Sequence, residues 1–197
     1  MTVAEPIAVT VEFAHGLDQL GLDYAVGGSI ASSLHGVPRS TQDIDVLVVL
    51  PGARVDPFVE YFSPSFYVDR DMIVDAIRRR ASFNVIHLAT MYKVDVFVAD
   101  RSQMIREELR RRRVVTIGEP PRDVWVCSPE DIILQKLVWY REGQEISERQ
   151  WSDVQGVLKV QADRLDREYI RKWASELGIS ELTQRALSDV ASPEGDD

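Results

Sequence analysis

Three aspartates are the residues of this sequence whose type and spacing could do chemistry. Asp43 and Asp45 are separated by one residue at the start of an apolar segment, so on a strand both side chains point to the same face. Asp95 is the only acidic residue of a second apolar segment, residues 92–99. Adjacent charged carboxylates repel each other, and a buried one is costly unless a cation lies beside it. If the two strands are neighbours, the pattern therefore indicates a site for Mg²⁺ or Mn²⁺ with oxygen ligands.

A glycine turn precedes the aspartate pair. Gly27 and Gly28 lack side chains where a short strand passes into a helix, so the backbone there can come close to a ligand. Ser29 and the helix N-terminus behind it offer a hydroxyl and N–H groups to a phosphate. Arg39 is a candidate second charge on the phosphates. Metal-binding carboxylates that face a phosphate-binding turn form the arrangement used for phosphoryl or nucleotidyl transfer.

Each of these features also has an ordinary structural explanation. A Gly-Gly pair is most often only a turn, an Asp-x-Asp pair occurs on many surface strands, and Asp95 could pair with Lys93 or with an arginine. The arginine runs at 78–80 and 110–113 could form a basic patch for nucleic acid, although cations also suit helix C-termini. The joint occurrence of the glycine turn and the three carboxylates favours a functional site.

The apolar periodicity predicts an α/β sheet followed by helices. Helices are expected at residues 7–20, 29–36, 54–62, 71–80 and 102–113, and strands at 23–28, 43–50, 82–89, 92–99, 114–118 and 124–128, the last two as edge strands. Four more helices, each beginning at Ser or Asp, are expected at 128–143, 147–161, 166–178 and 180–190. We therefore expect an α/β domain over residues 1–126, a helical part over 127–191 packed on it, and an acidic disordered tail over 192–197.

Composition narrows the classes of protein that remain. No apolar run is long enough to span a bilayer, and the first residues lack the pattern of a signal peptide, so we expect no membrane association. Cys127 is the only cysteine, which excludes an internal disulfide and favours a cytoplasmic location. With a formal charge of -9, the chain gains little from nonspecific attraction to nucleic-acid phosphates.

These residues resemble the nucleotidyltransferase superfamily related to DNA polymerase β. Its pattern is a glycine turn, an acidic pair one residue apart on a strand, and a third carboxylate on a later strand. Residues 27–48 look closest to the minimal bacterial members, which include AbiEii-type toxins and small antibiotic nucleotidyltransferases. The AbiEii-type proteins also carry a helical lysine followed by arginine and aspartate, which Lys136, Arg141 and Asp153 resemble. Gln150 stands where that motif has an acidic residue.

The resemblance implies a fold and a reaction. The fold would be a nucleotidyltransferase-type mixed sheet flanked by helices, with a C-terminal helical part. The reaction would transfer NMP from an NTP such as ATP to a hydroxyl acceptor and release pyrophosphate. Asp43 and Asp45 would hold both metal ions, and Asp95 would help to activate the hydroxyl as a ligand or a base. Lys136 would contact phosphate, unless it is only an amphipathic-helix lysine that reaches water. Asp153 could orient Lys136 or Arg141, or pair with a surface arginine.

The acceptor and the biological role stay open at this point. The acceptor could be an RNA or tRNA end, a protein hydroxyl, or a small molecule such as an antibiotic. The protein could be the toxin of a toxin–antitoxin pair with a cognate antitoxin, or a resistance enzyme. The alternatives are a non-catalytic protein of the same fold that binds a nucleotide or a partner, and another phosphotransferase such as a nucleotide kinase.

Overall fold

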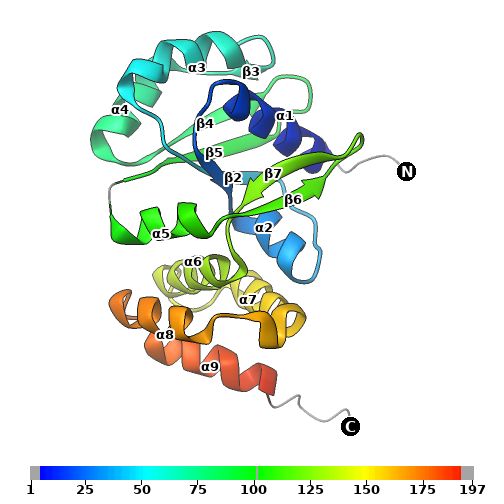
Figure 1. Cartoon of the computed structure of the whole chain (residues 1–197), viewed down its shortest axis with the longest axis vertical. Helices are drawn as coiled ribbons and strands as arrows, with labels where there is room; N and C mark the ends of the chain where they lie inside the picture. The colour runs from blue at the N-terminus through cyan, green and yellow to red at the C-terminus, as the bar shows by residue number, and fades with distance from the viewer. Residues whose placement is uncertain (1–4, 101, 192–197) are drawn as a thin grey trace. The chain divides into compact units, whose positions relative to one another are not determined.

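The computed structural model describes residues 5–100 and 102–191 (Figure 1). Contacts divide the chain into two compact units. The sheet unit comprises Met1–Ile30 and Ser40–Cys127, and the helical unit comprises Ala31–Arg39 and Ser128–Asp197. The acidic tail expected at 192–197 lies outside the described residues. Within those residues, no helix is both long enough and apolar enough to cross a membrane.

The described part of the sheet unit contains a mixed sheet with the strand order β3-β4-β5-β2-β1-β7-β6. Its strands are β1 (Tyr24–Val26), β2 (Asp43–Val48), β3 (Phe66–Tyr67), β4 (Ser82–His87), β5 (Lys93–Val98), β6 (Arg113–Ile117) and β7 (Arg122–Val126). The pairs β2–β5 and β1–β7 are parallel, and the other pairs are antiparallel. β7 lies between β1 and β6, so the expectation that it is an edge strand is wrong. Its Val124 and Val126 are buried, as suits an interior strand.

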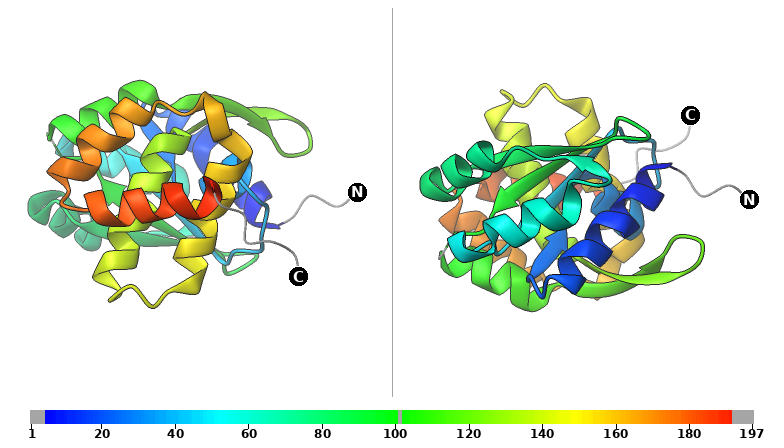
Figure 2. Two further views of the ribbon diagram at one scale, coloured as in Figure 1. Left: turned by 90° about the horizontal axis from the view of Figure 1, so that it is seen from below. Right: turned by 90° about the horizontal axis from the view of Figure 1, so that it is seen from above.

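The sheet unit also contains the helices α1 (Glu5–Gln19), α3 (Val55–Phe62, preceded by the 3-10 turn Gly52–Arg54), α4 (Arg70–Arg79) and α5 (Gln103–Arg111). Aromatic rings join α1 to α3. α1 contacts β1, β2 and β7, and it lies beside α3 in the right-hand view of Figure 2. The ring of Phe13 from α1 lies 4.6 Å from that of Phe62 in α3 and 6.2 Å from that of Phe58. All three rings are buried, so they contribute to the hydrophobic stabilisation of this unit.

The helical unit is built from the four capped segments that the sequence predicts. They form α6 (Pro129–Glu142), α7 (Glu148–Gln161, followed by the 3-10 turn Ala162–Arg164), α8 (Arg167–Glu176) and α9 (Ser180–Ala191). Ser128, Ser147 and Asp166 accept N-cap hydrogen bonds from backbone N–H groups of the first turns, which confirms three of the predicted caps. α6 contacts α7, α8 and α9, and α8 lies against α9 (Figure 2, left).

Residues 31–39 join the helical unit although they are distant from it in sequence. They include most of α2 (Gly28–His35) and the turn that follows it. Gly36 comes so close to α7 that a Cβ atom there would lie 2.7 Å from the backbone nitrogen of Val157. Gln161 donates a hydrogen bond of 2.6 Å to the carbonyl of His35. The units defined by contacts therefore differ from the division expected at residue 126, because residues 31–39 belong to the helical unit.

Candidate active site

The three aspartates of the sequence pattern lie on two adjacent strands. β2 and β5 are parallel neighbours, which confirms the adjacency on which the metal-site interpretation depends. Asp45 and Asp95 are Cα partners across this ladder, and Asp43 is the partner of Lys93. Because side chains alternate along a strand, all three carboxylates lie on one face of the sheet. The side chain of Asp95 is 18% exposed and that of Asp43 is 58% exposed, so the cluster runs from the interior to solvent.

The glycine turn lies directly against Asp45. Gly27 donates its backbone N–H to the carbonyl of Asp45 at 2.8 Å. Gly28 begins α2 with φ +53, and a Cβ atom there would lie 1.8 Å from Asp45 Oδ2. Only glycine adopts that backbone conformation readily and leaves that space empty. The helix begins one residue earlier than predicted, so Ser29 lies within its first turn. The turn thereby brings backbone N–H groups beside a carboxylate of the cluster.

Lys93 forms ion pairs within this carboxylate cluster. Its Nζ lies 2.8 Å from Asp95 Oδ2 and 3.6 Å from Asp43 Oδ1. The hydrogen bond to Asp95, reinforced by the charges of both aspartates, raises the pKa of Lys93 above its ordinary value. The ion pair with Lys93 that the sequence offered as an alternative explanation for Asp95 is therefore present. It accompanies the predicted cluster of carboxylates and does not replace it.

The donor set suits a hard divalent cation, because carboxylate oxygens are the ligands that Mg²⁺ and Mn²⁺ prefer. Among residues 5–100 and 102–191, however, no group of three or more His, Cys, Asp or Glu side chains is arranged as a metal site. Asp45 approaches the cluster from beside Gly28, while Asp43 and Asp95 share the ammonium of Lys93. The residues therefore fit a divalent ion by chemistry, with a lysine already placed among them.

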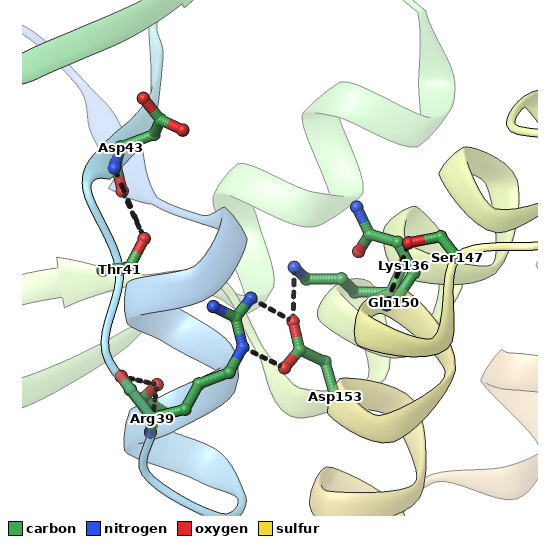
Figure 3. Close-up of polar contacts among 8 residues, drawn as sticks. Arg39, Thr41, Asp43, Lys136, Ser147, Gln150 and Asp153 are labelled. Carbon is green, nitrogen blue, oxygen red and sulfur yellow. Dashed lines mark hydrogen bonds and ion pairs between the residues drawn. The ribbon is translucent and has the colours of Figure 1, made fainter.

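A second polar cluster lies within the helical unit (Figure 3). Arg39 contacts Asp153 through two parallel hydrogen bonds, Nε to Oδ1 at 2.6 Å and Nη2 to Oδ2 at 2.7 Å. Lys136, on α6, lies with its Nζ 2.7 Å from the same Oδ2. The side chain of Lys136 is 2% exposed and that of Asp153 is 4% exposed. Two cations thus share one buried carboxylate.

This arrangement sets the protonation state of Asp153. Burial by itself would raise the pKa of the carboxyl group, but hydrogen bonds from Arg39 and Lys136 outweigh it and hold the pKa below its ordinary value. Asp153 contacts both Lys136 and Arg39, so two of the predicted alternatives, a contact with Lys136 and a pair with an arginine, occur together. The second predicted partner, Arg141, instead donates to the backbone carbonyl of Gly178. Gln150, the departure from the resembled motif, carries a buried Oε1 without a hydrogen-bond partner.

The arginine runs lie at helix ends and are engaged in ion pairs. α4 ends at Arg79 and α5 at Arg111, so the cations lie near helix C-termini, where the helix dipole favours them. Ion pairs join Arg78 and Arg79 to Asp75, Arg110 to Glu107, and Arg112 to Asp23. These contacts agree with a structural role for the runs and do not indicate a nucleic-acid surface.

The contact that the sequence did not predict is the one between Arg39 and Asp153. The two residues are 114 positions apart, and no periodicity or motif links them. Two sequence features connect these residues: they carry opposite charges, and both lie in segments that resemble the nucleotidyltransferases. Lys93 had a clearer signal, because the spacing Lys-x-Asp on a strand places its side chain on the face of Asp95.

The whole fold is similar to solved nucleotidyltransferase structures. The structure of ANT(2″)-Ia in complex with adenylyl-2″-tobramycin matches with a TM-score of 0.59 and 16% identity, over 89% of this chain and 98% of that chain. An antigenic nucleotidyltransferase-like protein from Paracoccidioides brasiliensis matches with a TM-score of 0.55 and 15% identity, over 95% and 94%. Lincomycin-bound LnuA, a lincosamide antibiotic adenylyltransferase, matches with a TM-score of 0.53 and 9% identity, over 81% and 99%.

Sequence comparison adds no closer relative: no protein-family model and no curated protein matches this chain. The structural likeness covers most of this chain and nearly all of each of the three solved chains. The mixed sheet flanked by helices, followed by a C-terminal helical part, agrees with the expectation from the glycine turn and the three aspartates. The chain therefore has the fold of the nucleotidyltransferases.

Proposed function

We propose that the protein is a metal-dependent nucleotidyltransferase that transfers NMP from an NTP to a hydroxyl acceptor. The observation that carries this proposal is the placement of Asp43, Asp45 and Asp95 on one face of two adjacent parallel strands, with the glycine turn against Asp45. The same fold occurs in solved adenylyltransferases. Mg²⁺ is the proposed cofactor, with Mn²⁺ as a substitute, and an NTP is the proposed substrate.

In this mechanism the side chains of the sheet unit have separate tasks. Asp43 and Asp45 bind the cation, which when bound neutralises phosphate charge and makes the α-phosphorus more electrophilic. Gly28 and Ser29 bring backbone N–H groups and a hydroxyl to phosphate oxygens at the start of α2, while Gly27, whose N–H is bonded to the Asp45 carbonyl, forms the turn before them. Asp95 accepts the proton of the acceptor hydroxyl while that oxygen attacks the α-phosphorus. The bond from the α-phosphorus to the bridging oxygen breaks, and pyrophosphate leaves with the electron pair.

Arg39 and Lys136 are proposed to bind phosphate oxygens. Asp153 holds both cations with charge-assisted hydrogen bonds. Guanidinium and ammonium groups are the side chains that bind phosphate oxygens, so the two residues suit an anionic group such as a triphosphate. Lys136→Met should raise the KM for the NTP more than it lowers kcat, whereas a purely structural lysine would change the free energy of unfolding and leave KM unaltered.

A small hydroxylated molecule is the proposed acceptor. One solved protein of this fold, LnuA, is bound to lincomycin, and another, ANT(2″)-Ia, is in complex with adenylyl-2″-tobramycin. Ion pairs with acidic side chains engage four arginines of the two runs, Arg78, Arg79, Arg110 and Arg112, and the formal charge of the chain is -9. Aminoglycosides and lincosamides are therefore the first acceptors to test, with pooled tRNA and a protein lysate as the other arms.

Label transfer from each of the four NTPs, with Mg²⁺ or Mn²⁺, tests the function directly. Asp43→Asn and Asp45→Asn should each lower the rate at least about 100-fold, because loss of a metal ligand costs more than loss of an outer-shell contact. Both variants should keep the circular-dichroism spectrum of the wild type, since each removes one charge from a repelling pair. An unchanged rate in either variant would contradict the mechanism, whereas nucleotide binding without transfer would favour the non-catalytic alternative.

A toxin role is compatible with this chemistry. The resemblance of residues 27–48 to the AbiEii-type proteins is the support for it, and a cognate antitoxin is the partner that it implies. Controlled expression in bacterial cells should then arrest growth, and Asp43→Asn should relieve the arrest. Growth that is unaffected by the wild-type protein would remove the toxin role and leave the nucleotidyltransferase proposal intact.

A further inference from the structure

The carboxylate face of the sheet continues beyond Asp95 onto β4 and β3. Asn84 of β4 is the Cα partner of Asp95, and residues directly opposite each other on antiparallel strands have Cβ atoms about 5 Å apart. Ile86, two positions further along β4, is the partner of Lys93 on one side and of Tyr67 of β3 on the other. Because side chains alternate along a strand, Asn84, Ile86 and Tyr67 lie on the same face of the sheet as Asp95.

This part of the carboxylate face is open to solvent, whereas the opposite face of the same strands is covered. Phe66 and Phe83, the sequence neighbours of Tyr67 and Asn84, are buried, and their rings contact rings of α1 or α3. Tyr67 is 55% exposed, and Asn84 is exposed as well. Helices thus cover one face of β3 and β4, and the face that carries Asn84 and Tyr67 is accessible to a ligand.

In the proposed reaction the acceptor approaches from the side of β4. The glycine turn and the N-terminus of α2 lie against Asp45 on the β2 side, where the phosphates are proposed to bind. The attacking and the leaving oxygen of a phosphoryl transfer lie on opposite sides of the phosphorus atom. Pyrophosphate leaves toward the glycine turn, so the hydroxyl that Asp95 activates arrives from the opposite side. The rest of the acceptor then lies on the open face beside Asp95.

The exposed side chains of this face indicate the chemistry of the acceptor. The amide of Asn84 can donate hydrogen bonds to hydroxyl groups and accept hydrogen bonds from them. The Tyr67 ring and the Ile86 side chain offer an apolar surface that extends to β3, two strand spacings or ~10 Å from β5. These three side chains carry no charge, whereas an RNA acceptor would require cations for its phosphates. The surface therefore suits a small molecule that carries a hydroxyl group beside an apolar part.

We propose that the open face of β4 and β3 is the acceptor site, and that it binds a small hydroxylated molecule with an apolar part. Asn84 hydrogen-bonds a hydroxyl group of the acceptor, Tyr67 and Ile86 pack against its apolar part, and its reacting hydroxyl lies at Asp95. This inference rests on the proposed nucleotidyl transfer and deepens it, because it names the residues that bind the acceptor and the chemistry that they select.

Label transfer from the preferred NTP to three acceptors tests the site. Lincomycin is a hydroxylated sugar with apolar groups, tobramycin is a polar polycation, and pooled tRNA is a polyanion. The kcat/KM for lincomycin should exceed that for the other two at least about tenfold. Tyr67→Ala should raise the KM for lincomycin about tenfold and leave the KM for the NTP unaltered, because it removes an apolar contact with the acceptor alone. Asn84→Ala should raise the KM for lincomycin about fivefold through the loss of one hydrogen bond.

Two control variants and a binding measurement accompany the kinetics. Tyr67→Phe keeps the ring and should retain the wild-type KM for lincomycin. Val114→Ala removes an exposed apolar side chain from β6, at the other edge of the sheet, and should match the wild type. Thermal unfolding should show little change in any variant, because the substituted side chains are exposed. In a chain saturated with the α,β-methylene analogue of the NTP, lincomycin should shift the amide NMR signals of residues 66–67 and 84–87.

The outcomes separate the inference from the function beneath it. A raised KM for lincomycin in Tyr67→Ala, with an unaltered KM for the NTP, would support the inference. Transfer to tobramycin or tRNA and not to lincomycin would overturn the inference and still support the proposed function. An unaltered KM for lincomycin in both alanine variants, or amide shifts confined to other segments, would overturn the site in the same way. Nucleotide binding with neither transfer nor shifts in β3 and β4 would also overturn the site, and a chain that neither binds nor transfers nucleotide would overturn both proposals.

Discussion

At the scale of single residues, the charge of Asp153 depends on its two cationic partners, Arg39 and Lys136. A carboxylate that is 4% exposed stays charged because Arg39 and Lys136 compensate for its lost hydration. Lys136 depends on Asp153 in the same way, since it is almost completely buried. The ion pairs of Asp153 therefore stabilise the helical unit and also hold Arg39 and Lys136, the two residues that are proposed to bind phosphate.

Asp153→Asn should lower the free energy of unfolding at pH 7 by about 3 kcal/mol, because it removes the negative charge that contacts both Arg39 and the buried Lys136. Urea unfolding followed by circular dichroism measures the difference. Asp163→Asn, an exposed change in the 3-10 turn after α7, is the matched control and should alter the free energy little. Equal effects of the two substitutions would contradict the structural role assigned to Asp153.

The pH dependence of stability follows from the lowered pKa of Asp153. A carboxyl group whose pKa is lower in the folded state contributes stability at neutral pH, and this contribution is lost as the pH falls below about 4 through the folded-state pKa. Between pH 7 and pH 3, wild-type stability should therefore fall more than that of Asp153→Asn. Parallel urea titrations at several pH values check this, and identical slopes would exclude the proposed charge state.

At the scale of elements, the turn between β1 and α2 places the N-terminus of α2 beside Asp45 of β2. β1 is only three residues long, yet it pairs with β2 on one side and β7 on the other. The turn that follows has space for no side chain at Gly28. Helix, strand and carboxylate are therefore held together by backbone geometry as well as by side-chain packing.

Gly28→Ala should destabilise the protein by more than about 2 kcal/mol, from the left-handed backbone and the overlap with Asp45. It should also abolish label transfer, because either Asp45 or the turn must move. Gly52→Ala is the matched control: no atom lies within 4 Å of a Cβ at Gly52, so its Tm should change little. Thermal unfolding and the transfer assay measure both effects, and normal activity in Gly28→Ala would argue against a role for the turn.

At the scale of the whole molecule, the helical unit takes one of its parts from the N-terminal half of the sequence. Residues 31–39 supply Arg39 to Asp153, the carbonyl of His35 to Gln161, and the close contact of Gly36 with α7. A cut at residue 127 or 128 therefore separates parts that belong to one compact unit.

A fragment of residues 128–191 should accordingly lack native stability, because it leaves Asp153 without Arg39 and exposes part of α7. We expect low helix content by circular dichroism and a gain when a peptide of residues 28–40 is added. The same peptide with Arg39→Met should restore less. A fully folded fragment that ignores the peptide would contradict the assignment of residues 31–39 to this unit.

The sequence by itself determined most of the elements and the residues of the carboxylate cluster. Alternation along a strand places Asp43 and Asp45 on one face, and a glycine pair before a helix indicates a close backbone approach, so both were readable from local pattern. The same holds for the N-caps at Ser128, Ser147 and Asp166, which are local hydrogen bonds. The two-residue strand β3 was missed because so short a segment leaves no periodicity.

Only the tertiary structure decided which distant residues meet. The parallel register of β2 and β5 placed Lys93 opposite Asp43, and the return of residues 31–39 to α7 placed Arg39 on Asp153. Both contacts depend on the pairing of segments far apart in the chain, which no local spacing encodes. The position of β7 inside the sheet was decided in the same way, by its pairing with β1. Local sequence patterns thus identified the candidate site residues, and the pairing of distant segments determined which of those residues are in contact.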